Sequence, residues 1–194
     1  MIILGSKSPR RKQLLLECGF EFIVKHFEVD ESFPETLKQQ EVPLYLSQKK
    51  AELYPDSLND VLLICADTIV CLDEMTINKP ADYQEAFTML KLLSGRMHEV
   101  YTGITLRKGN EYRSFYERTE VYFKPLTDHE IKEYITHFNP YDKAGGYGIQ
   151  DWIGYIGVEK IVGCYYNVMG LPISRLYKEL LEFYPESVKS VQHS

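Results

Sequence analysis

The sequence predicts an α/β protein in which helices flank a mixed, twisted sheet. Residues 61–72 form a continuous apolar run rich in β-branched side chains, a pattern typical of a strand buried on both faces. Helix-start signals occur at Ser8, Asp82 and Thr127. Strand-like and helical segments follow one another along the chain, and their order is typical of an α/β fold with a mixed sheet.

The first half of the chain is predicted to contain five elements. Ser8 is a suitable N-cap, Pro9 suits the first position of a helix, and Gly19 is suited to end it. Pro43 favours a second helix start for the same reason. The expected elements are a strand at 1–4, a helix at 9–18, a strand at 22–29, a helix at 43–53 and the strand at 61–72.

The second half is predicted to contain a hairpin among helices. Asp82 and Glu85 resemble a capping box, as do Thr127 and Glu130. Residues 108–110 read as a hairpin turn between two strands. The expected elements are a helix at 82–93, strands at 99–106 and 112–123, a helix at 127–138, a strand at 155–162 and a helix at 172–183.

Length and charge limit the class of protein. The chain has 194 residues, of which 44% are apolar and 26% charged, so we expect one domain over residues 1–184 and a frayed tail at 185–194. The net charge is −6, with a sequence pI of about 5.4. A protein that binds duplex nucleic acid normally carries a basic stripe, so we expect no stable nucleic-acid complex.

The cysteines and the apolar segments favour a cytoplasmic protein. Cys65 and Cys71 lie in one predicted strand, too far apart for a disulfide, and no CxxC pair occurs. The longest apolar run is too short to span a bilayer and contains Asp67. The apolar stretch at residues 1–4 is far too short for the hydrophobic region of a signal peptide. We therefore expect reduced core cysteines and no membrane association.

Asp67 is the first candidate for chemistry. It lies with Thr68 in the middle of the predicted strand at 61–72. A carboxylate in a buried strand is unfavourable unless it is paired or bound to a metal, and Asp is a poor strand former. The alternative interpretation is an Asp at a strand end that only caps a loop.

A second candidate is the segment 5–11, Gly-Ser-Lys-Ser-Pro-Arg-Arg. It follows a predicted strand and begins a helix, where backbone N–H groups and the helix dipole favour an anion. Arg10 and Arg11 are unfavourable there unless an anion lies between them and the helix. The alternative is a solvated basic helix start.

Three further segments could contribute to the same site. Lys79 follows the Asp67 strand closely, although a lone lysine is more often an exposed loop residue. Residues 142–150 combine Lys143, three glycines and Gln150, so the backbone could approach a ligand closely. Residues 165–172 form a loop before a helix and are a weak signal alone.

Together these motifs resemble the Maf family of nucleotide pyrophosphatases, over residues from about 2 to 180. Two departures from the family pattern occur: Asn78 stands where Gly usually precedes Lys-Pro, and Phe138-Asn139 stands where Gly-Glu often precedes Pro140. The matching segments are 5–11, 30–32, 46–51, 66–68, 79–80, 85–86, 93–103, 142–150 and 167–172.

The resemblance implies a two-lobed fold around a central cleft, a divalent metal (Mg²⁺ or Mn²⁺) and a homodimer. It implies hydrolysis of a nucleoside triphosphate to the monophosphate and pyrophosphate, with dTTP or UTP as substrate and possible removal of non-standard pyrimidine nucleotides. The implied catalytic residues are Asp67, Glu31 and Lys79, and the implied metal ligands are Asp67 and Glu31. The substrate-binding candidates are Ser6, Arg10, Arg11, Lys50, Thr68, Lys143 and Gln150.

Three alternatives remain open. Family members that resemble 7-methyl-GTP pyrophosphatases carry Trp, Gln and Glu at the positions of Arg10, Thr68 and Gln150, so this chain looks like the dTTP/UTP type. A nucleotide-sensing regulator of septum formation without important turnover is disfavoured by the intact Asp67 and Glu31. An RNA-binding module is disfavoured by the negative net charge.

Overall fold

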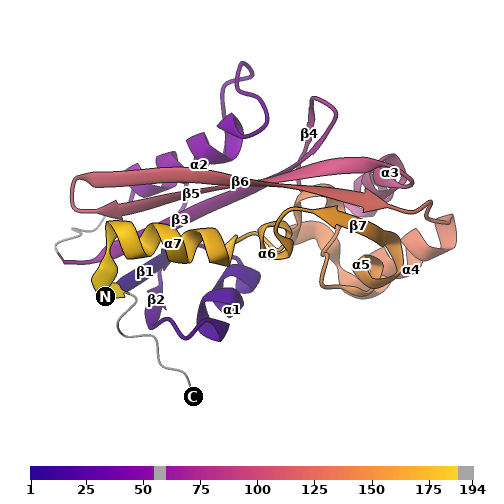
Figure 1. The fold of residues 1–194 in the computed structure, drawn as a ribbon. Helices are drawn as coiled ribbons and strands as arrows, with labels where there is room; N and C mark the ends of the chain where they lie inside the picture. Colours follow the sequence, from indigo (N-terminus) through magenta and orange to yellow (C-terminus); the bar gives the residue numbers. More distant parts are fainter. Residues whose placement is uncertain (55–59, 188–194) are drawn as a thin grey trace.

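The computed structural model describes residues 1–54 and 60–187, and in this part of the chain seven strands form one mixed sheet (Figure 1). The strand order is β2-β1-β3-β5-β6-β7, and β4 pairs with β3. β1 pairs parallel with β2 and β3, and the other pairs are antiparallel. The strands are β1 (Ile2–Gly5), β2 (Phe22–Val24), β3 (Leu62–Leu72), β4 (Met75–Ile77), β5 (Met97–Lys108), β6 (Glu111–Phe123) and β7 (Val158–Val162).

Seven helices occur in the described residues, and the predicted caps are confirmed. The side chain of Ser8 accepts from Arg11 N, that of Asp82 accepts from Glu85 N, and Thr127 begins a complete capping box. The helices are α1 (Pro9–Glu17), α2 (Glu41–Glu52), α3 (Tyr83–Leu93), α4 (Asp128–Phe138), α5 (Trp152–Gly157), α6 (Tyr165–Val168) and α7 (Ile173–Phe183). Short 3-10 turns are η1 (Pro140–Asp142), η2 (Ala144–Gly146) and η3 (Pro185–Ser187).

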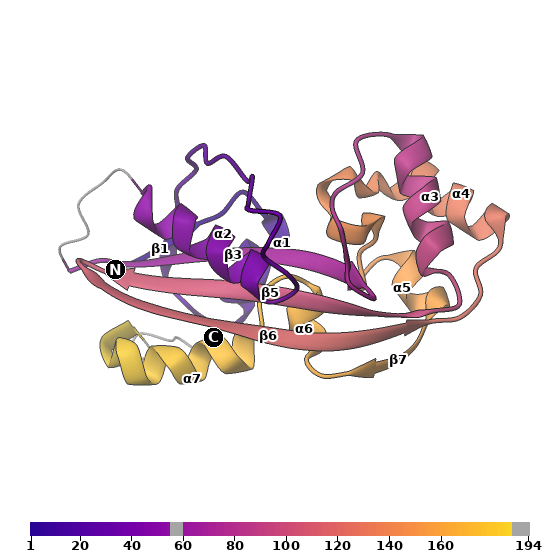
Figure 2. The same ribbon diagram turned by 90° about the horizontal axis from the view of Figure 1, so that it is seen from above.

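The long strands β3, β5 and β6 connect two lobes. Figures 1 and 2 show α1, α2 and α7 at one end of these strands and α3, α4 and α5 at the other. α2 covers one face of the sheet and α7 covers the opposite face. The predicted α/β class, with a mixed sheet and two lobes, is therefore confirmed.

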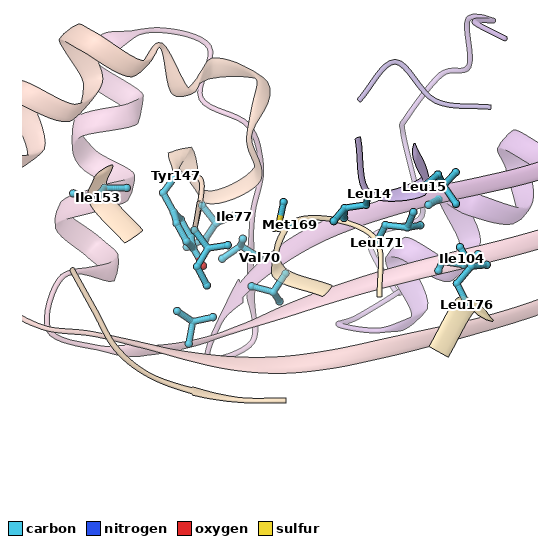
Figure 3. Packing of buried hydrophobic residues seen from close by; sticks show 14 of the residues in the cluster. Leu14, Leu15, Val70, Ile77, Ile104, Tyr147, Ile153, Met169, Leu171 and Leu176 are labelled. Carbon is cyan, nitrogen blue, oxygen red and sulfur yellow. The ribbon is translucent and has the colours of Figure 1, made fainter. Parts of the chain in front are cut away.

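Alternation along β3 separates two apolar cores. Ile69 and Cys71 pack with Val42 and Leu46 of α2. The opposite face contributes to a larger cluster that extends through both lobes. Figure 3 shows Met169 of this cluster between Tyr147 on one side and Leu14 and Leu171 on the other. Neighbouring residues of β3 therefore point to opposite faces of the sheet. Asp67 and Thr68, which are consecutive, lie on opposite faces for the same reason.

One edge of β3 lies open in its middle. β1 pairs with β3 up to Cys65, and β4 pairs with β3 from Val70. β5 covers the other edge throughout. Among the described strands, none pairs with residues 66–69 on the β1 side, so the backbone of this segment has no ladder partner at that edge. The segment of β3 without a neighbouring strand at this edge therefore includes Asp67, the predicted catalytic residue.

Several sequence predictions need correction. The strand expected at 22–29 ends at Val24, because its partner β1 is only four residues long. The strand expected at 155–162 begins at Val158, since residues 155–157 continue α5 after Asp151, whose carbonyl accepts from Gly154 N. α2 begins at Glu41, two residues before Pro43. β4 and α6 were not predicted, because three or four residues are too few to establish a period.

The tail and the cysteines complete the comparison. Residues 185–187 of the expected frayed tail form η3, and residues 188–194 lie outside the described part of the chain. All four cysteines are free thiols, and burial raises the pKa of Cys65 to about 12 and that of Cys71 to about 11. Among the described helices, none combines the length and apolar character needed to cross a bilayer.

Candidate active site

A cleft of about 500 Å³ lies along the open edge of β3. The loop between β1 and α1 forms one wall, the region of η1 and η2 forms another, and the end of α6 contributes a third. All ten residues that the sequence nominated line this cleft, although they come from distant segments: Ser6, Arg10, Arg11, Glu31, Lys50, Asp67, Thr68, Lys79, Lys143 and Gln150.

Lys50 lies between the two predicted catalytic carboxylates. Its Nζ donates to Asp67 Oδ1 at 2.6 Å and to Glu31 Oε1 at 2.8 Å. Lys79 Nζ is 3.5 Å from the other oxygen of Glu31. Asp67 is only 7% exposed, so the ammonium group of Lys50 supplies the pairing that a buried carboxylate requires. The expected cost of an acidic residue inside a buried strand is offset in this way.

The packing of α2 places Lys50 over Asp67. α2 lies directly on Gly103 of β5, where an added Cβ would be 2.4 Å from the carbonyl carbon of Pro43. At the other end of the helix, Arg107 Nη1 donates to the carbonyl of Ala51 at 2.7 Å. A cation at a helix C-terminus is favourable both as a hydrogen-bond donor and for the helix dipole. Both ends of α2 are therefore fixed to β5.

The surrounding charges keep two cleft carboxylates ionised. Burial raises the pKa of Glu31, but the hydrogen bonds and charges of Lys50 and Lys79 together lower it by more, and the net pKa is below its ordinary value. Burial also raises the pKa of Asp142, and Lys143 and Arg10 bring the net pKa below its ordinary value. Both groups remain anionic at neutral pH and can attract cations of the protein or of a ligand complex.

Arg11 points inward and connects four segments. Its Nε donates to Gly170 O at 2.8 Å, Nη1 to Ala66 O at 2.8 Å and Ser6 Oγ at 3.2 Å, and Nη2 to Thr68 Oγ1 at 2.9 Å. Burial lowers its pKa. Within the described residues, these bonds use four of the five N–H groups of the guanidinium, which leaves one Nη2 N–H for a ligand. Arg11 therefore holds the cleft walls together, and its contact with substrate stays a prediction.

Arg10 turns to the other wall of the cleft. Its Nη1 donates to Asp142 Oδ2 at 2.7 Å, and Lys143 Nζ donates to Asp142 Oδ1 at 2.8 Å. Lys143 Nζ also lies 3.7 Å from Asp151 Oδ2. Two of the predicted substrate-binding cations thus share one carboxylate. Asp142 was not among the residues nominated from the sequence, because nothing local to it indicates a partner 132 residues away.

Gln150 ends the glycine-rich segment and lines the cleft with an unsatisfied acceptor. Its Oε1 is buried and has no hydrogen-bond partner within the described residues. The segment packs against the core, because Tyr147 is 5% exposed and Ile149 is 4% exposed. The Tyr147 hydroxyl lies 2.7 Å from Nε2 of His98, which is also buried. A rigid support therefore holds an acceptor that only a ligand or water can satisfy.

The carboxylate pair fits a metal that binds together with a nucleotide. Among the described residues, no group of three or more His, Cys, Asp or Glu side chains could hold a metal ion. Asp67 and Glu31 nevertheless converge on one point, since both accept from Lys50 Nζ. Mg²⁺ is usually bound through one or two carboxylates and substrate phosphates. These residues fit that incomplete donor set.

Sequence reasoning missed two buried polar residues beside the cleft. Thr102 of β5 is fully buried and lies 2.9 Å, oxygen to oxygen, from Thr68. Asn167 of α6 is fully buried, and its Nδ2 donates to Val100 O at 2.9 Å. Thr102 belongs to the alternating face of a predicted strand, and this was the signal that could have nominated it as an inward polar residue.

The fold and the cleft define an α/β protein in which a carboxylate pair lies among basic side chains at an open strand edge. Residues 1–183 match the family model described as Maf-like protein, and the chain belongs to this family. The resemblance noted from the motifs is therefore confirmed over nearly the whole chain.

Individual relatives carry a more specific name. A dTTP/UTP pyrophosphatase of Cytophaga hutchinsonii is 50% identical over 186 residues, which cover 95% of this chain and 85% of that protein. A dTTP/UTP pyrophosphatase of Parabacteroides distasonis is 47% identical, with coverage of 94% and 95%. One from Phocaeicola vulgatus is 50% identical, with coverage of 92% and 94%. The family match over residues 1–183 includes every segment that lines the cleft.

Proposed function

We propose that this protein is a nucleoside triphosphate pyrophosphatase that hydrolyses dTTP and UTP to the monophosphate and pyrophosphate. The arrangement of Asp67, Lys50 and Glu31 carries the proposal, because it places a buried carboxylate at the base of a cleft rich in cations. Relatives of 46 to 50% identity named dTTP/UTP pyrophosphatase support the same reaction and substrates.

The proposed reaction is attack of water on the α-phosphorus. Asp67 accepts the proton of the attacking water, and the bond between the α-phosphorus and the bridging oxygen to the β-phosphorus breaks. Lys50 contacts Asp67 and Lys79 lies beside Glu31, and both can neutralise the charge that develops on the leaving pyrophosphate. General-base catalysis of this kind typically contributes about 10²–10⁴ in rate.

Asp67 and Glu31 would hold the divalent metal, Mg²⁺ or Mn²⁺, in the company of triphosphate oxygens. The metal would supply electrostatic stabilisation of phosphate charge. Lys50 now donates to both carboxylates, so it must shift when a cation binds them. Ser6, at the start of the α1 loop, would then contribute to binding of the phosphates at the helix N-terminus.

Gln150 is the proposed base reader and distinguishes the two substrate types of the family. A glutamine side chain offers one acceptor and one donor, which matches the carbonyl and N3–H groups of uracil and thymine. The alternative, a 7-methyl-GTP pyrophosphatase, is disfavoured because Arg10, Thr68 and Gln150 differ from the residues of that type. The Gln150 acceptor, which has no partner among the described residues, favours a base with an N–H donor.

The test is a substrate panel with pyrophosphate detection. Purified protein with Mg²⁺ is incubated with UTP, dTTP, CTP, GTP, ATP and 7-methyl-GTP. We expect pyrophosphate release from UTP and dTTP well above that from the purine nucleotides. Preference for 7-methyl-GTP would support the alternative enzyme type. Nucleotide binding without turnover would support the regulator, and omission of the metal tests the cofactor.

The family resemblance further supports a homodimer in the cytoplasm that forms no stable complex with nucleic acid. Light scattering coupled to gel filtration tests the oligomeric state, because a dimer elutes with twice the 22.6 kDa mass of the chain. A chain that elutes as a monomer at all concentrations would contradict this part of the proposal.

A further inference from the structure

A chain of hydrogen bonds connects the cleft to the buried backbone of α6. Arg11 Nη2 lies 2.9 Å from Thr68 Oγ1, and Thr68 Oγ1 lies 2.9 Å from Thr102 Oγ1. Thr102 Oγ1 lies 3.1 Å from the carbonyl oxygen of Asn167. Thr68 lines the cleft, whereas Thr102 and Asn167 are fully buried.

The groups at the two ends of this series of hydrogen bonds determine which atom donates and which accepts in each bond. A carbonyl oxygen can only accept, so the single hydroxyl proton of Thr102 goes to Asn167 O. Thr102 Oγ1 must then accept in the other bond, so the hydroxyl of Thr68 donates its single proton to Thr102. At the other end, a guanidinium can only donate, so Thr68 accepts from Arg11. One lone pair of Thr68 remains.

We propose that Thr102 is a specificity-determining positioning residue, because it makes the Thr68 hydroxyl an acceptor-only group toward the cleft. Thr102 touches no ligand and acts through Thr68 alone. This inference rests on the proposed function and deepens it. A nucleotide group that meets Thr68 must carry an N–H or O–H donor, and a nucleotide with an acceptor at that place leaves two lone pairs facing each other.

The surroundings of Thr68 keep this direction fixed. Arg11 is held from the opposite side by Gly170 O at 2.8 Å, and an added Cβ on Gly170 would lie 3.4 Å from Thr68 Oγ1. Asn167 is itself anchored, because its Nδ2 donates to Val100 O and Thr119 Oγ1. The Arg11 end cannot reverse, because a guanidinium has no acceptor, and at the other end Asn167 O accepts from Gly170 N at 2.9 Å as well as from Thr102.

Two donor groups that UTP and dTTP share could meet the acceptor: N3–H of the base and the 3′-hydroxyl of the sugar. CTP has an acceptor at N3 in place of the donor. 3′-O-methyl-UTP keeps the sugar oxygen but has lost its proton. The ratio of kcat/KM on UTP to kcat/KM on each analogue therefore measures the penalty for presenting an acceptor, and the two analogues distinguish the sources.

The experiment compares wild type with Thr102→Val and Thr102→Ser. Val has the shape of Thr but no hydroxyl, so Thr68 recovers a free proton that can turn toward the ligand. We expect the penalty on one analogue to fall about threefold to tenfold in Thr102→Val, the scale of one neutral hydrogen bond. Thr102→Ser retains the relay and should keep the wild-type penalties. A purely structural role would lower activity on all substrates equally.

Unchanged penalties for both analogues in folded Thr102→Val would overturn the proposal. If Thr102→Val fails to fold, Thr68→Val and Thr68→Ser make the same comparison, and an unchanged penalty in folded Thr68→Val overturns it equally. Absence of UTP hydrolysis by wild type would instead contradict the proposed function. The same ratios are then measured as Kd values by calorimetry with UTP, CTP and 3′-O-methyl-UTP.

Discussion

Asp67 and Gly103 face each other across the β3–β5 ladder, and the backbone of Pro43 lies over Gly103 where a side chain would otherwise stand. The missing side chain at Gly103 lets α2 approach the sheet closely. Because Lys50 is on the same helix, this approach sets its 2.6 Å contact with Asp67. A glycine opposite the proposed catalytic carboxylate is thus part of the geometry of the site.

Gly103→Ala should therefore damage both stability and turnover. The new Cβ would lie 2.4 Å from the carbonyl carbon and oxygen of Pro43, so α2 must move away from β5. Overpacking of this kind typically costs about 1–3 kcal/mol of unfolding free energy. Urea denaturation and UTP turnover measure the two effects. Gly157→Ala is the control, since its Cβ would meet side-chain carbons alone, Leu126 Cδ2 at 3.1 Å and Ile153 Cγ1 at 4.0 Å. Equal behaviour of the two variants would refute the role of Gly103.

Asp67→Asn should reduce turnover by about 10²–10⁴ and leave the fold intact. The amide keeps the size of the side chain but cannot accept the proton of the attacking water. Steady-state kinetics with UTP and a circular dichroism spectrum check the two statements. Asp73→Asn is the matched control, because Asp73 is exposed and lies at a left-handed turn position with φ 55° that Asn tolerates. Near-normal turnover by folded Asp67→Asn would exclude it as the base.

The products of UTP hydrolysis should be UMP and pyrophosphate from the earliest time points. Attack at the α-phosphorus breaks the bond to the bridging oxygen and releases the β- and γ-phosphates together. Ion-exchange chromatography of samples taken in the first few per cent of reaction detects both products. Early UDP with inorganic phosphate would place the attack at the γ-phosphorus and contradict the proposed reaction.

The elements with strong local signals could be predicted from the sequence. Ser8, Asp82 and Thr127 are caps whose partners lie three residues away, so a short window contains the whole interaction. The strand at Leu62–Leu72 is long enough to show its buried character. β4 and α6 are stabilised by the surrounding tertiary structure, and their own few residues carry too little information.

The members of the site could be predicted, but not their partners. Asp67 was an anomaly within its own strand, which made it visible. Arg11 gave no indication that it would turn inward, because its acceptor at Gly170 is 159 residues away in the chain. The same holds for Arg10 and Asp142. Long-range polar pairs depend on the complete fold, whereas an unfavourable residue in a regular element is apparent locally.

His98 should make stability depend on pH. Burial lowers the pKa of His98 from 6.5 to about 3, so the folded protein holds it neutral. Below about pH 6.5 the imidazole binds a proton in the unfolded chain but stays neutral in the folded protein. The contribution of His98 to the free energy of unfolding is therefore complete above pH 6.5 and is lost as the pH falls toward 3. One such proton changes the unfolding free energy by about 1.4 kcal/mol per pH unit.

His98→Phe removes this proton and keeps a ring beside Phe123 and Tyr147. Between pH 7 and pH 5, wild type should lose about 2 kcal/mol more unfolding free energy than the variant. Urea titrations at both pH values measure the difference. The exposed His129, changed to Phe, is the control and should follow wild type. Parallel loss in wild type and His98→Phe would show that His98 is not the titrating group.

Gln150→Glu should selectively weaken activity on pyrimidine nucleotides. Gln150 Oε1 is buried, lines the cleft and has no partner in the described structure, so a ligand donor satisfies it. The amide also offers an N–H to a carbonyl of uracil or thymine, whereas an ionised Glu offers acceptors only.

One unsatisfied buried polar group costs about 1–3 kcal/mol, and this is the expected loss of transition-state binding for UTP and dTTP in Gln150→Glu. Glu can accept from the two N–H donors of a guanine edge, so kcat/KM on 7-methyl-GTP should fall less than kcat/KM on UTP, or should rise. The measurement is kcat/KM of both proteins on UTP, dTTP, GTP and 7-methyl-GTP. If Gln150 only supports the glycine-rich segment below it, all four values fall by the same factor. An unchanged ratio among the four substrates would therefore remove Gln150 from base recognition and leave it a structural residue.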